Sequence, residues 1–248
     1  MGTSPTRAVV ITGASTGIGE ACALRLDRAG FTVFAGVRSA ESGERLRRQA
    51  SGRLIPIMLD VTDEGSIELA AAAVAARLGD GGIAGLVNNA GIAVAGPLEF
   101  VPVAKLREQF EVNVVGQLAV TRAFLPLLRK SSGRIVNMSS VSGRLAVPFI
   151  GPYSASKWAL ESLSDSLRVE LRPWKIHVAL IEPGVIATPI WSKSLAAAER
   201  LIESFPPEAH VLYGPVIDFM RRRAVSGAGI PTDRVARAVA HALLARRP

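Results

Sequence analysis

The sequence contains few of the residues that build disulfide frameworks and metal sites. Its 248 residues include one cysteine, Cys22, and three histidines that lie far apart in the chain. A single cysteine excludes an internal disulfide framework, and scattered histidines lack the spacing of metal ligands, so no metal site is predicted. This cysteine usage favours a reducing, cytoplasmic location.

Long apolar runs are missing as well. No segment has about eighteen uninterrupted apolar residues, and residues 1–6 lack the apolar stretch of a signal peptide. The sequence therefore predicts neither secretion nor membrane insertion. Its share of hydrophobic residues, 49%, and of charged residues, 20%, is typical of a folded domain.

A motif for nucleic-acid binding is absent despite a net charge of +8. The basic residues are spread along predicted helices, as they are on solvated helix faces, and Arg221 to Arg223 form the one tight run. Aromatic residues are not interleaved with the basic ones, so no nucleic-acid partner is expected. A small polyanionic cofactor needs only a few of these charges.

What the chain does contain is a regular alternation of short Val- and Ile-rich runs with longer helical patterns. Such alternation predicts βαβ units, and therefore an α/β fold with a parallel sheet and helices on both faces. No change in composition marks a second domain, so residues 1–248 are predicted to form a single domain. The expected strands lie at 8–12, 31–36, 54–59, 83–88, 134–138 and 175–181.

Local signals mark several helix ends. Gly30 lies where the first helix should stop, Asp63 followed by Ser66 suggests a helix start, and Pro173 ends a later helix. Residues 189–231 have the weakest periodicity and several prolines, and they are interpreted as a helical flap over a cleft. The final helix is followed by no strand, which leaves a trimmed or disordered C-terminus as an alternative.

A glycine-rich turn follows the first predicted strand in "VVITGASTGIGEACALRL". Gly13, Gly17 and Gly19 have the spacing GxxxGxG, with Ser15, Thr16 and Ile18 between and beside them. Glycines let the backbone approach a pyrophosphate, whose charge then lies at a helix N-terminus. The turn is therefore predicted to bind a dinucleotide; the alternative is a close-packed turn without a ligand.

The end of the second strand bears on the choice of cofactor. In "FAGVRSAES" Arg38 stands where an NAD enzyme would carry an acidic residue for the ribose 2′-hydroxyl. A guanidinium suits a 2′-phosphate because it forms charge-assisted, bidentate hydrogen bonds. NADP(H) is therefore preferred over NAD(H), although Arg38 is alternatively a solvated loop charge.

Six motifs follow one another over almost the whole chain: "TGASTGIG" (12–19), "NNAG" (88–91), "FEVNVVG" (110–116), "NMSS" (137–140), "YSASK" (153–157) and "EPGVIAT" (182–188). Together they resemble the short-chain dehydrogenase/reductase family. The stretches "FAGVR" (34–38) and "PYSASKWALESLSDSLRVEL" (152–171), with the C-terminal helix, are most similar to its steroid and retinol dehydrogenase branch.

The resemblance implies a Rossmann-type doubly wound fold, an oxidoreductase using NAD(P)(H), and a homodimer or homotetramer joined through helices around 102–130 and 153–172. It implies a final strand after the last helix, which is absent here. It also implies a catalytic tetrad of Asn113, Ser140, Tyr153 and Lys157. Further cofactor contacts implied in the same way are Asp60, Val61, Asn89, Ala90, Gly91, Pro183, Gly184, Val185 and Thr188.

The tetrad residues suit proton transfer to a carbonyl oxygen. Tyr153 and Lys157 are i and i+4 neighbours on one helix, so the ammonium is expected to lower the phenol pKa from its usual value near 10. Ser140, at a strand end, can hold the substrate oxygen. By resemblance, Asn113 interrupts its helix and supports a water linked to Lys157.

Apolar residues around the expected substrate side favour a lipophilic alcohol or ketone, such as a steroid or retinoid. Leu145, Phe149 and Trp191, with Phe205 further on, are expected to contact it beside Ser140 and Tyr153. Alternatively these side chains pack on the protein's own flap. Two other functions stay open: a non-catalytic NADP(H)-binding sensor or scaffold, and an epimerase or dehydratase.

Overall fold

A computed structural model describes residues 7–187, 197–226 and 229–246 of the chain. It contains one six-stranded sheet whose neighbouring strands all pair in parallel, in the order β3-β2-β1-β4-β5-β6. The strands are β1 (Ala8–Ile11), β2 (Thr32–Val37), β3 (Leu54–Met58), β4 (Gly85–Asn88), β5 (Arg134–Met138) and β6 (His177–Ile181).

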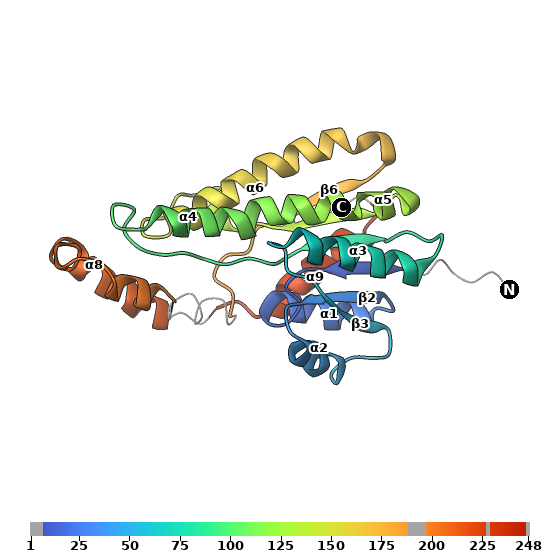
Figure 1. Ribbon diagram of the computed structural model, residues 1–248, viewed down its shortest axis with the longest axis horizontal. Helices are drawn as coiled ribbons and strands as arrows, with labels where there is room; N and C mark the ends of the chain where they lie inside the picture. The colour runs from blue at the N-terminus through green and yellow to red at the C-terminus, as the bar shows by residue number, and fades with distance from the viewer. Residues whose placement is uncertain (1–6, 188–196, 227–228, 247–248) are drawn as a thin grey trace.

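Helices cover both faces of this sheet (Figure 1). One core is built from side chains of α1 (Gly17–Arg28), α2 (Ala40–Arg47) and α9 (Thr232–Leu244). The other is built chiefly from α3 (Glu64–Leu78) and α5 (Gly116–Ser131). Strand β1 contributes Val9 and Ile11 to the first core and Ala8 and Val10 to the second, because successive strand residues point to opposite faces.

The remaining helices belong to the second face or extend beyond the sheet. The long helix α6 (Gly151–Glu170) packs against β6, and α4 (Val103–Phe110) packs against α6. Short 3₁₀ helices, η2 (Val141–Gly143) and η3 (Arg172–Trp174), flank α6. Helix α8 (Pro207–Ser226) lies away from the sheet at one end of the molecule, as Figure 1 shows.

These elements confirm the predicted fold class, a doubly wound α/β architecture with a parallel sheet. From β1 the chain proceeds outward to β2 and β3, then crosses to β4 on the other side of β1 and proceeds to β5 and β6. The strand order therefore reverses between β1 and β4, where a crevice opens at the carboxyl ends of the strands.

The local helix signals also agree with the structure. Asp63 caps α3, with its side chain accepting a hydrogen bond from the Ser66 amide at 3.1 Å. Gly30, just after α1, has φ +86°, a left-handed conformation that glycine adopts without a steric penalty. Helix α6 ends at Glu170, before Pro173.

The region interpreted as a flap contains a helix at 197–203 and then α8. Ile186, which precedes this region, pairs with Ile230 near its end through a parallel bridge. Within the described residues no strand follows α9, and β6 forms one edge of the sheet. The flap as a functional unit stays a prediction.

Candidate active site

A cleft of about 550 Å³ opens at the carboxyl ends of β1, β4 and β5. It brings together predicted residues that lie up to about 170 positions apart in the sequence. The predicted residues that line it are Gly13, Ser15, Thr16, Gly17, Ile18, Arg38, Asp60, Val61, Asn89, Ala90, Gly91, Ser140, Tyr153, Lys157, Pro183 and Gly184.

Several predicted residues take other positions. Gly19 and Asn113 lie behind the cleft wall, and Val185 is 61% exposed beside it. Thr188 and Trp191 lie outside the described residues.

The glycine-rich turn has the geometry that a pyrophosphate site needs. Gly13 and Gly17 both have φ +63°, which L side chains rarely adopt. A Cβ built on Gly19 would overlap the carbonyl oxygen of Gly13 and come within 2.5 Å of Asn89 Nδ2. The Thr16 side chain makes no capping hydrogen bond, so the first amides of α1 keep their capacity to bind an anion. A dinucleotide fits this cradle.

A threonine that the sequence analysis missed holds the turn against the loop after β4. Thr12 is completely buried, and its Oγ1 accepts hydrogen bonds from the amides of Asn89 and Ala90, each at 2.9 Å. In return, Asn89 Nδ2 donates to the carbonyls of Thr12 at 3.0 Å and Gly13 at 3.1 Å. A polar residue at the end of an apolar strand was the available signal.

Asn113 lies in a π-helical turn, η1 (Glu111–Val115), between α4 and α5. This turn is the helix interruption that the resemblance implied. The Asn113 side chain is fully buried; its Oδ1 accepts from the Ile92 amide at 2.9 Å, and its Nδ2 donates to the Ile92 carbonyl and Ser156 Oγ at 3.1 Å. It therefore fastens the loop after β4 to α6.

Tyr153 and Lys157 project from α6 into the cleft, one turn apart. Lys157 Nζ lies 5.6 Å from the centre of the Tyr153 ring and donates a hydrogen bond to the Met138 carbonyl at 2.8 Å. Both side chains are buried, at 8% and 4% exposure. Ser140 follows β5, and its side chain hydrogen-bonds Tyr153 and accepts from the Ser142 amide at 3.1 Å.

Comparison with known proteins agrees with this geometry. A family model described as short chain dehydrogenase matches residues 7–199, more than half of the chain. The chain belongs to the short-chain dehydrogenase family.

Individual relatives support the same assignment. Retinol dehydrogenase 5 of Mus musculus is 37% identical over 250 residues, which cover 97% of this chain and 78% of the relative. A short chain dehydrogenase/reductase of Burkholderia phymatum in complex with NAD superimposes with a TM-score of 0.82 at 28% identity, covering 100% of this chain and 89% of that one.

A short chain dehydrogenase of Burkholderia cenocepacia in complex with NADP has a TM-score of 0.75 at 28% identity, over 96% of this chain and 84% of that one. The predicted resemblance to the retinol dehydrogenase branch is confirmed, as is the prediction of an oxidoreductase that uses NAD(P)(H). The neighbours contain both forms of the cofactor.

The expectation that Lys157 lowers the pKa of Tyr153 was wrong for this dehydrogenase without a bound cofactor. The pKa of Tyr153 is raised, not lowered, because burial disfavours the phenolate more than the hydrogen bond with Ser140 favours it. Burial also lowers the pKa of Lys157 to about 8, against the opposing charge of Glu161. The i,i+4 spacing identified the pair correctly as neighbours, but the sequence did not show how deeply both groups are buried.

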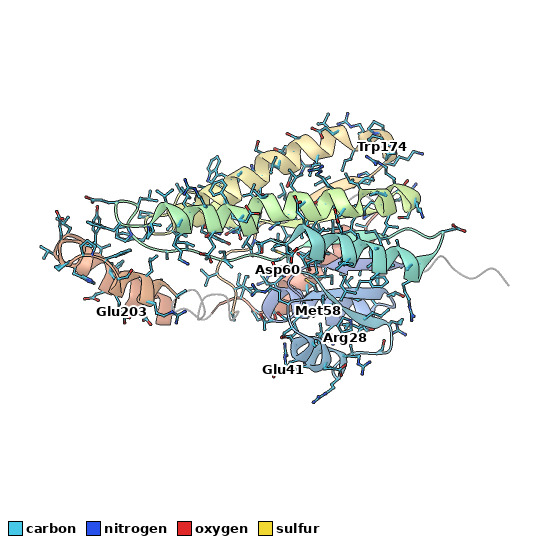
Figure 2. The ribbon with its side chains drawn as sticks, in the orientation of Figure 1. Arg28, Glu41, Met58, Asp60, Trp174 and Glu203 are labelled. Carbon is cyan, nitrogen blue, oxygen red and sulfur yellow. The ribbon has the colours of Figure 1, made fainter. Side chains whose placement is uncertain are left out.

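One end of the dehydrogenase cleft carries Asp60 and Arg38. Asp60, labelled in Figure 2, follows β3; hydrogen bonds from the Thr62 amide and hydroxyl, and the charge of Arg38, lower its pKa. Arg38 is exposed at the end of β2. Arg45, which the sequence analysis did not select, donates to the Ser15 carbonyl and pairs with Glu20 at 2.7 Å, so α2 supports the glycine-rich turn.

Of the apolar residues predicted to contact the substrate, Leu145, Phe149 and Phe205 do not line the cleft. Leu145 is 64% exposed. Phe149 has φ +66° and lies edge-on to the Tyr213 ring of α8, with centroids 6.0 Å apart. Phe205 is buried, and the centroid of its ring lies 6.0 Å from that of Phe100. Apolar lining that the sequence analysis did not select by residue comes from Ile92, Val94, Ile186, Ala198 and Leu201, of which the last two lie in the region predicted to be a flap.

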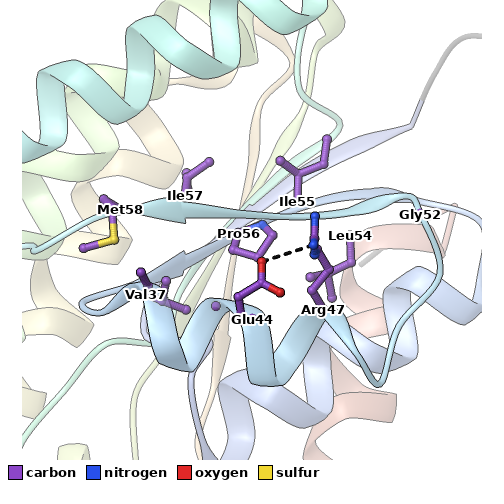
Figure 3. Close-up of a pocket in the computed structure, with 11 residues that line it drawn as sticks. Val37, Glu44, Arg47, Gly52, Leu54, Ile55, Pro56, Ile57 and Met58 are labelled. Carbon is purple, nitrogen blue, oxygen red and sulfur yellow. Dashed lines mark ion pairs between the residues drawn. The ribbon is translucent and has the colours of Figure 1, made fainter.

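A second hollow, of about 470 Å³, lies between α2 and the edge strand β3 (Figure 3). Figure 3 shows an ion pair of Glu44 and Arg47 in front of Pro56. The two charged groups are 3.2 Å apart. None of the predicted site residues lines this hollow, although Val37 lines both the hollow and the cleft.

Proposed function

We propose that this dehydrogenase is an NADP(H)-dependent oxidoreductase that interconverts a lipophilic secondary alcohol and a ketone. The observation that carries the proposal is the meeting of Tyr153, Lys157 and Ser140 in one cleft with the glycine-rich turn. A phenol, a buried amine and a hydroxyl at a strand end form a proton-transfer site next to a dinucleotide cradle.

In this proposal a nicotinamide cofactor, when bound, supplies the hydride to the carbonyl carbon or accepts it from the alcohol carbon. Tyr153 donates a proton from its hydroxyl to the carbonyl oxygen during reduction and takes it back during oxidation. Ser140 holds the same substrate oxygen through its hydroxyl. Lys157, as an ammonium, favours the phenolate that Tyr153 becomes.

Asn113 has a supporting role in the proposal. Its buried amide joins the loop after β4 to Ser156, one residue before Lys157. The π-helical turn around it changes the backbone hydrogen bonding of the helix at this point. We propose that a water held at this turn carries protons between Lys157 and solvent.

The preference for NADP(H) rests on Arg38. It is exposed at the cleft, and its charge contributes to lowering the pKa of Asp60, so a 2′-phosphate placed there would meet a cation. Arg38→Ala is expected to weaken NADPH binding about ten- to a hundredfold, the size of a lost charge-assisted interaction, while NADH binding changes little.

Fluorescence titration of both reduced cofactors measures this difference. Arg28→Ala, an exposed arginine at the end of α1 outside the cleft, is the matched control and should bind both cofactors as the unmodified protein does. Equal weakening of NADPH and NADH binding by Arg38→Ala would contradict the preference.

A lipophilic substrate is supported by the apolar side chains in the cleft wall, among them Val94, Ile186 and Leu201. The charged residues Lys105 and Glu108 also line it, but they pair with each other at 2.6 Å. The relative named retinol dehydrogenase supports the same substrate class.

A panel of steroids, retinoids and simple ketones, assayed with NADPH and NADH in parallel, tests the proposal. We expect oxidation of NADPH with at least one lipophilic ketone and slower reaction with polar carbonyl compounds. Tight cofactor binding without turnover on any substrate would favour the non-catalytic sensor. A clear preference for NADH would contradict the role given to Arg38.

We further propose that the protein is a cytoplasmic homodimer or homotetramer. Large apolar side chains on α6 and the neighbouring π-helical turn are exposed, including Trp158 at 50%, Val169 at 62% and Val115 at 49%. Such a surface is suited to contact with a second copy. Among the described residues, every helix is too short or too polar to cross a membrane.

A further inference from the structure

Glu161 is a buried acidic residue directly behind the candidate active site. It follows Lys157 by one turn of α6, so Tyr153, Lys157 and Glu161 form one stripe along the helix. Glu161 is 4% exposed, and among the described residues its two buried carboxylate oxygens accept no hydrogen bond, although Oε2 forms an ion pair with Arg144. A buried carboxylate of this kind needs compensation by positive charge.

The compensation comes from two sides. Arg144, from the loop after η2, places Nη2 2.8 Å from Glu161 Oε2 and 3.1 Å from Glu182 Oε1. Lys157 is the second cation, and its charge interacts with that of Glu161. The charged groups around this cluster are thus Lys157 and Asp165 on α6, Arg144 after η2, and Glu182 after β6.

The loop that carries Ser140 is shaped to fit over Glu161. A Cβ added at Gly143 would lie 3.1 Å from Glu161 Cγ and 2.8 Å from Ser139 Oγ. The absence of a side chain at Gly143 therefore lets this loop pack directly on the acidic side chain. Glu161 therefore contacts the Ser140 loop at Gly143, and it lies one turn after Lys157 on α6.

We propose that Glu161 is a positioning residue of this active site, whose buried carboxylate keeps Lys157 in the ammonium form while Arg144 holds that carboxylate under the Ser140 loop. The catalytic importance of the Lys157 ammonium rests on the proposed function. The electrostatic interaction between Glu161 and Lys157 does not depend on it.

The direction of the effect follows from the charges. Burial lowers the pKa of Lys157 to about 8, and the Glu161 charge opposes this decrease. Removing the negative charge therefore lowers the pKa of Lys157 further, so more of the lysine is neutral at pH 7. Removing Arg144, a cation, acts on Lys157 in the opposite direction.

The chain contains five lysines, so isotope labelling of the lysine side chains and NMR titration resolve Lys157 without any substrate. Lys157→Arg assigns its signal. In Glu161→Gln the titration midpoint of Lys157 is expected to fall by about one pH unit, the usual effect of losing one nearby opposite charge. In Glu161→Asp it should lie closer to that of the unmodified protein.

Arg144→Gln separates this role from a purely structural one, because it breaks the same ion pair from the other side. We expect the Lys157 midpoint to rise in Arg144→Gln, because a nearby positive charge is removed. Glu44→Gln, which removes an exposed ion pair in the second hollow, is the control for a charge change elsewhere.

An unchanged midpoint in Glu161→Gln would overturn the proposal, as would an equal fall in both Glu161→Gln and Arg144→Gln. If Glu161→Gln does not fold, Arg144→Gln decides alone: a raised midpoint there supports the proposal, and an unchanged or lowered one contradicts it. Where turnover is measurable, the high-pH limb of kcat/KM should shift in the same direction as the midpoint. A protein without turnover but with the Lys157 shift would refute the proposed function and leave this coupling intact.

Discussion

Replacing Tyr153 with phenylalanine is expected to reduce kcat by roughly 10³-fold, because the variant keeps the buried ring and loses the hydroxyl that exchanges the proton. The ring lies above the Lys157 ammonium and is 8% exposed, so its removal would leave a cavity, whereas phenylalanine preserves the packing. Cofactor binding should stay within severalfold. Steady-state rates with the best substrate of the panel and a fluorescence titration of NADPH measure the two quantities.

The second tyrosine of the chain gives a matched control. Tyr213 belongs to α8, and its hydroxyl donates to Glu99 at 2.7 Å on the exposed side of the flap. Tyr213→Phe also removes one phenolic hydroxyl but should keep kcat within severalfold. Turnover near the unmodified rate in Tyr153→Phe would mean that another group supplies the proton.

Replacing Gly19 with alanine is expected to weaken binding of either cofactor about a hundredfold. The added methyl group would overlap the backbone carbonyl of Gly13 and crowd Asn89 Nδ2, which hydrogen bonds to the Thr12 and Gly13 carbonyls hold in place. The turn and the loop after β4 must then move apart, which disturbs the cradle and costs about 1–3 kcal/mol of folding stability. Titration of NADPH and NADH, with urea unfolding of the same variant, measures both effects.

Gly52→Ala is the control for this substitution, since nothing lies within 4 Å of a Cβ at that position. It should bind both cofactors with unchanged affinity and unfold at a similar urea concentration. If Gly19→Ala bound cofactor as tightly as Gly52→Ala, the packed turn would not be a dinucleotide site.

The strands and the fold class were predictable because the signal for them is local. A strand buried on both faces is mainly apolar, so a run such as Ala8–Ile11 is recognisable from the residues alone. The caps at Asp63 and Gly30 are local as well, since a side chain and an amide three residues apart, or one left-handed residue, determine each.

The candidate site was predictable in part for a similar reason. The spacing of Tyr153 and Lys157 fixes them on one face of a helix, and the position of the glycines between a strand and a helix fixes the turn. Their assignment to one cleft, however, came from the resemblance to a family. Nothing in the local sequence says that residues near 13, 90 and 153 meet at one end of the sheet.

The sequence by itself thus determined the alternation of strands and helices, the helix caps and the residue types available for chemistry, because these depend on neighbours within a few positions. The tertiary structure decided which groups are buried and which charges face each other. It buried Tyr153 and raised its pKa, placed Thr12 across from Asn89, and set Arg144 against Glu161. Desolvation and contacts between distant segments arise only when the chain folds, and they set the proton affinities on which the proposed chemistry depends.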